Sequence, residues 1–107
     1  MRLLLDECVP QRLSRQLQEF EVSHVASEGW AGRRNGDLLR AMRIAGFDVL
    51  VTVDRNLVYQ QNVASAGLAV IVLHARGNRV RDLLPLLPEL RESAARIRSG
   101  EIVHLGG

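Results

Sequence analysis

Three aspartates stand where an α/β protein can build a site: Asp6, Asp37 and Asp54. Asp6 directly follows the apolar run Leu3–Leu5, and Asp54 directly follows the run 50–53. An acid after a buried strand needs a partner, because burying an unpaired carboxylate is costly. In an open parallel sheet, binding sites form beyond the carboxyl ends of the strands. If the two runs are neighbouring strands, the carboxylates of Asp6 and Asp54 meet at one edge.

Clustered carboxylates predict a bound cation, because like charges that close either share protons or bind a positive ion. Oxygen ligands without His or Cys favour Mg²⁺ or Mn²⁺ over Zn²⁺. Such an ion can activate water and stabilise the oxyanions of a phosphodiester displacement. We therefore predict a catalytic Mg²⁺ or Mn²⁺ site at Asp6, Asp37 and Asp54, with Glu7 and Asn56 as second-tier candidates.

Each acid also has a structural interpretation that the residues alone leave open. Asp37 lies in the first turn of a predicted helix, where an acid favours the positive end of the helix dipole. Asp54 can cap the helix that follows it. Glu7 can be a surface residue or a cap.

Arginine supplies the candidate contacts to substrate. All 14 basic residues are Arg, which suits phosphate recognition, although GC-rich codon usage gives the same composition. The net charge of +2 is too small to indicate a basic nucleic-acid-binding surface. We take Arg33, Arg34 and Arg55 as candidate phosphate contacts. Trp30, in the same loop as Arg33, can stack a base or pack the loop down.

The elements that must position these residues alternate between apolar runs and helical stretches. Strands are predicted over 2–5, 21–26, 47–53, 68–73 and 101–105. Helices are predicted over 10–20, 36–45, 55–66 and 80–98. Pro85 and Pro88 should break or kink the last helix.

Strands alternating with helices predict a three-layer α/β/α fold with a mainly parallel central sheet of four or five strands. The length of 107 residues fits one domain over 1–107, and 47% hydrophobic residues argue against disorder. The single cysteine, Cys8, fits a reducing compartment. No signal peptide or membrane-length apolar run is visible. We therefore expect a cytoplasmic protein with no membrane partner.

Three segments resemble the PIN-like proteins predicted to be nucleases of toxin–antitoxin systems. The opening strand ends in Asp-Glu-Cys and leads to an early Pro, at Asp6 to Pro10. The central segment 28–39 places Asp37 at the start of a helix. The third segment, 50–57, ends a strand with Thr-x-Asp at Asp54. The resemblance covers nearly the whole chain.

This resemblance implies a PIN-like fold and an endoribonuclease toxin that cleaves RNA with Mg²⁺ or Mn²⁺. It also implies a cognate antitoxin protein and a homodimer as partners. Asp6, Asp37 and Asp54 match the first, second and third acids of the family. The second acid is usually Glu in PIN domains, and Asn56 is neutral where larger PIN domains often offer another acid.

Two other functions fit parts of the same pattern. A receiver-like signalling domain also has an Asp-Glu pair after its first strand and an Asp after its third, but it needs a Lys that this chain lacks. A decayed nuclease that only binds RNA or a partner protein fits the neutral Asn56 and the short chain.

Overall fold

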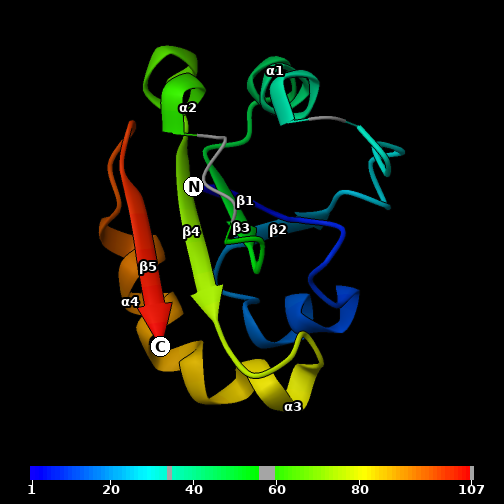
Figure 1. The fold of residues 1–107 in the computed structure, drawn as a ribbon, viewed down its shortest axis with the longest axis vertical. Coiled ribbons are helices and arrows are strands. Elements are labelled where there is room, and N and C mark those ends of the chain that lie inside the picture. The colour runs from blue at the N-terminus through cyan, green and yellow to red at the C-terminus, as the bar shows by residue number, and fades with distance from the viewer. Residues whose placement is uncertain (34, 56–59, 107) are drawn as a thin grey trace.

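A five-stranded sheet forms the centre of the computed structural model, which describes residues 1–33, 35–55 and 60–106 (Figure 1). Its strands lie in the order β2-β1-β3-β4-β5, and every neighbouring pair is parallel. The strands are β1 (Arg2–Leu5), β2 (Glu21–His24), β3 (Val49–Thr52), β4 (Ala69–His74) and β5 (Ile102–Gly106). The predicted parallel α/β sheet is therefore confirmed.

Helices alternate with the strands along the chain and cover both faces of the sheet. They are η1 (Gln11–Gln16), α1 (Asn35–Ala45), α2 (Gln60–Ala66), α3 (Val80–Leu83), η2 (Leu84–Leu86) and α4 (Leu87–Arg96), where η marks a 3₁₀-helix. In Figure 1, α1 and α2 lie on one side of the sheet, and α3 and α4 lie on the other. This is the three-layer α/β/α arrangement that the alternating pattern predicts.

Alternate residues of each strand supply two separate cores. Leu4 and Leu50 pack on one face with Met42 of α1. Leu5 and Val51 pack on the other face, in the cluster that includes residues of η1 and α4. Both faces are covered, so the central strands are apolar throughout rather than alternating with polar residues.

The strand order places a crevice between β1 and β3. These strands are neighbours, with Leu5 opposite Val51, while β2 lies on the other side of β1. The chain therefore continues from β1 to β2 in one direction across the sheet, and from β3 to β4 in the opposite direction. In open α/β sheets, ligands bind outside the carboxyl ends of the strands at such a switch point. Asp6 and the segment leading to Asp54 leave the sheet there.

Several boundaries differ from those predicted. The expected helix 10–20 is only the 3₁₀-helix η1, because Pro10 offers no side-chain cap and the Leu13 N–H bonds the Pro10 carbonyl in a tight turn. The strands predicted at 21–26 and 47–53 are shorter, ending at His24 and Thr52. In the described residues, helix α2 begins at Gln60 rather than at 55.

The prolines break the long helical stretch as predicted. Pro85 lies in η2, and Pro88 stands in the first turn of α4, where its missing N–H costs no helical hydrogen bond. In the described residues, no helix is both long enough and apolar enough to cross a membrane.

Candidate functional site

Asp6 is held rigidly where β1 ends. Its backbone N–H donates to the Val51 carbonyl at 2.9 Å, which extends the β1–β3 pairing by one residue. Its side chain is only 7% exposed, and its Oδ1 accepts the Glu7 N–H at 2.9 Å. A carboxylate fixed in this way keeps one orientation toward whatever enters the crevice.

Thr52 links the two acids of the crevice. Its hydroxyl donates to Asp6 Oδ2 at 2.7 Å and accepts the Asp54 N–H at 3.0 Å, and the residue is fully buried. A Thr hydroxyl that accepts an N–H two residues on forms a tight local turn. This turn carries the chain from β3 to Asp54. The Thr of the Thr-x-Asp motif therefore has a structural role, which is to hold both acids through its hydroxyl. The sequence pattern did not indicate this role.

The loop that follows Asp6 is anchored from two further elements. His24 Nδ1 accepts the Ala26 N–H at 3.0 Å, so Nε2 carries the proton and donates to the Val9 carbonyl at 2.6 Å. The Asn78 side chain donates to the Cys8 carbonyl at 3.1 Å. His24 is thus a structural residue, and the loop 6–9 is fixed before any ligand binds.

A pocket of about 300 Å³ lies at this edge, and we call it the acid pocket. Its lining includes Asp6, Glu7, Cys8, Arg33 and Asp54. Asp54 is exposed, so a buried and an exposed carboxylate share one opening. The structure therefore places together the two acids that strand position alone had paired.

Asp37 is not among the residues that line the acid pocket. It stands in the first turn of α1, as predicted, and lines an adjoining pocket that shares Arg33. Its Oδ1 lies 3.6 Å from Arg40, and both side chains are exposed. Within residues 1–33, 35–55 and 60–106, no group of three or more His, Cys, Asp or Glu side chains gathers as a metal cage would require.

The other predicted site residues lie around the rim. Glu7 Oε1 accepts the Gly32 N–H at 3.3 Å, which ties the loop before α1 to the acid pocket. Arg33 is exposed there, with its guanidinium carbon 5.9 Å from the Trp30 ring centre. Trp30 packs its edge on Phe47. The candidates Arg34 and Asn56 lie outside the described residues.

Arg55 and a histidine pair lie near the carboxyl end of β4. Arg55 Nη2 donates to the Ala75 carbonyl at 3.2 Å. His74 Nε2 and His104 Nδ1 share a hydrogen bond at 2.8 Å between neighbouring strands. Burial, then the positive charge of Arg55 and the contact with His104, lower the pKa of His74 below its usual 6.5. The two histidines lie thirty residues apart in the sequence, so no local pattern connects them. Only the pairing of β4 with β5 shows that they meet.

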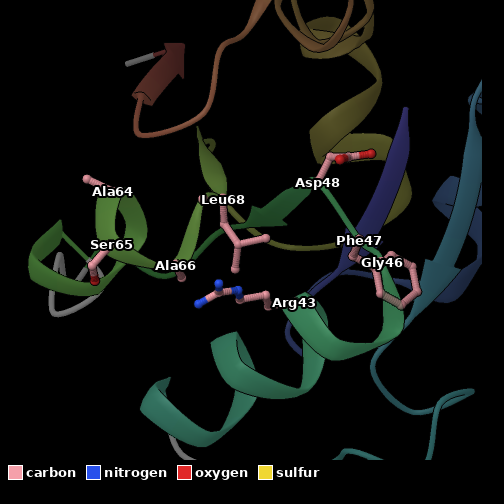
Figure 2. Close-up of a pocket in the computed structure, with 9 residues that line it drawn as sticks. Arg43, Gly46, Phe47, Asp48, Ala64, Ser65, Ala66 and Leu68 are labelled. Carbon is pink, nitrogen blue, oxygen red and sulfur yellow. The ribbon is translucent and has the colours of Figure 1, made fainter.

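A larger pocket of about 440 Å³ opens at the opposite edge of the sheet (Figure 2). Arg43 extends into it from α1, and among the described residues Asp48 supplies the only carboxylate of its lining. Asp48 accepts the Arg2 N–H at 2.8 Å at the amino end of β1. This pocket lacks paired acids and lies away from the switch point, so the acid pocket is the better candidate despite its smaller volume.

The donor set of the acid pocket fits a hard divalent cation. Mg²⁺ commonly binds proteins through one or two carboxylates, with waters and substrate phosphates filling its other positions. Asp6 and Asp54 offer two such carboxylates, and Asp6 is oriented by hydrogen bonds from Thr52 and Glu7. Hydrogen-bonded partners of this kind are typical of carboxylates that ligate metals.

The fold and the pocket together define an α/β protein with paired acids at the switch point of a parallel sheet. Comparison with protein-family models, with curated proteins and with solved structures finds no match to this chain.

Proposed function

We propose that this protein is a divalent-metal-dependent endoribonuclease, with Asp6 and Asp54 as the acids that hold Mg²⁺ or Mn²⁺. The observation that supports it most is the pairing of these carboxylates in one pocket, linked through the buried Thr52 hydroxyl. The cation, when bound, would supply Lewis-acid stabilisation of the phosphodiester oxygens and activate water.

The chain's own residues would orient and neutralise the substrate. Asp6 is held by Thr52 and Glu7, so it presents a fixed carboxylate without further reorganisation. Arg33 stands on one side of the acids, and Arg55 directly follows Asp54 on the other. Guanidinium groups suit phosphate oxygens because they donate two parallel hydrogen bonds. These positions support a phosphodiester substrate over a neutral one.

The biological part of the proposal rests on the resemblance of the three acid segments to PIN-like toxins. On that basis we propose that the protein is the toxin of a toxin–antitoxin pair. Its partners would be RNA, a cognate antitoxin protein and a second copy of the chain.

The test combines Mn²⁺ binding with RNA cleavage. The wild-type protein should bind Mn²⁺, measured by calorimetry, and should cut a labelled RNA only when Mg²⁺ or Mn²⁺ is present. Asp6→Asn and Asp54→Asn should each lose cleavage to background and weaken Mn²⁺ binding. Asn at position 6 keeps one oxygen that can accept the Thr52 hydrogen bond, whereas its NH2 group replaces the oxygen that accepts the Glu7 N–H. A thermal midpoint close to that of the wild type will show that the variant folds.

Asp48→Asn is the matched control, because Asp48 lies at the opposite edge of the sheet. It should bind Mn²⁺ and cut RNA as the wild type does. Cleavage at the wild-type rate by Asp6→Asn would overturn the proposed function. Asp37→Asn tests the residue that matches the second acid of the family: a loss of cleavage equal to that of Asp6→Asn assigns it to the site.

A second candidate is a catalytically decayed module that binds RNA or a partner protein. It is favoured by the position of Asp37, which is paired with Arg40 and does not line the acid pocket. This candidate predicts RNA binding with no cleavage at any Mn²⁺ concentration. It also predicts that Asp6→Asn leaves RNA affinity unchanged.

A further inference from the structure

A pocket of about 330 Å³ opens at the carboxyl end of β4, and we call it the arginine pocket. Its polar lining is His74, Arg76, Arg81 and Asp82. Arg76 lies between β4 and α3 in the chain. The loop that joins these two elements is the yellow-green segment of Figure 1. Arg76 and Arg81 thus reach the same concave surface from a loop and from a helix.

The two arginines of this pocket outnumber its one described carboxylate, which belongs to Asp82. Neither Arg76 nor Arg81 makes an ion pair or a side-chain hydrogen bond within the described residues, and both are exposed. The Asp82 carboxylate accepts the Arg79 N–H at 3.2 Å where α3 begins, and it forms no ion pair with either arginine. Two guanidinium groups that line one pocket, neither of them in an ion pair with a described residue, favour an anion.

Arg55 and His74 add to the positive character of this edge. Arg55 donates to the Ala75 carbonyl, next to Arg76 in the chain. Its charge is one of the causes that lower the pKa of His74, so its positive field extends over the end of β4. His74 also lines the pocket and offers it a polar ring.

The arginine pocket is fixed in position relative to the acid pocket. β3 and β4 are parallel neighbours with Thr52 opposite Val72, so the segments that follow them leave the sheet at the same edge. Asn78, in the loop after β4, donates to the Cys8 carbonyl of the acid pocket. With Arg33 on the far side, cations stand on both sides of the paired acids.

We propose that the arginine pocket binds a backbone phosphate of an RNA strand, while another phosphodiester of the same strand lies in the acid pocket. This inference rests on the proposed function, because RNA is the substrate that it assigns. The chemistry is that of guanidinium groups with a phosphate, which fixes the position of the strand and carries no base information. Arg76 and Arg81 would therefore be positioning residues for cleavage.

The test measures RNA binding with the metal removed. Wild-type protein in EDTA is titrated into a fluorescein-labelled single-stranded RNA, and anisotropy is followed over a range of salt concentrations. The double variant Arg76→Gln and Arg81→Gln should raise Kd by about tenfold at low salt. The slope of log affinity against log salt should fall by about 0.7, because one phosphate contact is lost from a single strand.

The matched control removes two arginines from the opposite edge of the sheet, Arg43→Gln with Arg98→Gln. Arg43 lines the pocket of Figure 2, and the turn after Arg98 bonds the Leu68 carbonyl ahead of β4. The control loses the same net charge, but at positions away from the proposed phosphate site. It should therefore keep the wild-type salt slope. All four arginines are exposed, and equal thermal midpoints will show that both double variants fold.

The two proposals fail in different ways. Equal RNA affinity for the double variant and its control overturns the arginine pocket as a phosphate site, even if the wild type cuts RNA. Wild-type protein that does not bind RNA at all also overturns it. Weaker binding by the double variant alone supports the site, and the metal-dependent cleavage assay then decides the proposed function separately.

Discussion

At the scale of single residues, Thr52 decides the geometry of the acid pocket. Its hydroxyl is the only described group that bonds both the Asp6 carboxylate and the Asp54 backbone. Thr52 is fully buried at the end of β3, so bulk solvent does not reach its hydroxyl. A carboxylate held from behind by a hydroxyl has less freedom to turn away from a ligand.

Thr52→Val should keep the shape of the side chain while leaving Asp6 Oδ2 and the Asp54 N–H without this partner. We expect Mn²⁺ affinity to fall by about tenfold. We also expect the free energy of unfolding to fall by about 1–3 kcal/mol, because a buried acceptor loses its donor. Calorimetric Mn²⁺ titration and urea denaturation measure the two effects.

Thr52→Ser is the matched control, because it retains the hydroxyl and removes only a methyl group. It should bind Mn²⁺ nearly as the wild type does. If the Val and Ser variants lose Mn²⁺ affinity equally, the hydroxyl bridge has no part in forming the pocket.

At the scale of elements, the end of β5 depends on the backbone of a glycine. Gly106 has φ +81°, and a side chain there would overlap the His74 carbonyl of β4 and approach Leu86 of η2. The close approach lets β5 pair with β4 as far as His74. This same pairing brings His104 to His74 and shapes one wall of the arginine pocket.

Gly106→Ala should therefore cost more than the strain of a positive φ alone. Gly29→Ala is the matched control, because Gly29 has a similar φ of +77° but no atom within 4 Å of a new Cβ. We expect Gly29→Ala to cost about 1–2 kcal/mol in unfolding free energy. Gly106→Ala should exceed it, with overlap added to strain. Equal losses in urea denaturation would show that β5 does not close on β4 as described.

At the scale of the whole molecule, one sheet separates two cores that share its strands. Leu50 packs on the α1 side and Val51 on the α4 side, although they are consecutive residues of β3. Loss of this strand would remove both cores together. Trp30 packs against the α1-side core through Phe47. Its fluorescence therefore reports on one face, whereas far-UV circular dichroism reports on all helices and strands.

We predict one cooperative unfolding transition, with coincident midpoints for Trp30 fluorescence and circular dichroism. Leu90→Ala removes a fully buried side chain from the face away from Trp30 and should cost about 2–5 kcal/mol. Both probes should shift by the same amount. A variant that shifts the circular dichroism transition and leaves the fluorescence transition in place would show two separate folding units.

The sequence by itself determined the layers of the fold, because the residues buried by each helix or strand recur at that element's own spacing. Short apolar runs alternating with helical spacing predicted the parallel sheet, and proline chemistry predicted the break between α3 and α4. Strand ends also predicted that Asp6 and Asp54 would meet, since both follow runs that became the neighbouring strands β1 and β3. Local chemistry was enough for these conclusions.

Only the tertiary structure decided which side chains share a site. The position of Asp37 depends on how α1 packs over the sheet, and there it pairs with Arg40 rather than lining the acid pocket. The bridge through Thr52, the His74–His104 pair and the arginine pocket all join residues from different elements. Such contacts depend on strand register and loop path. A sequence pattern records burial along one element, whereas a site requires the distances between several.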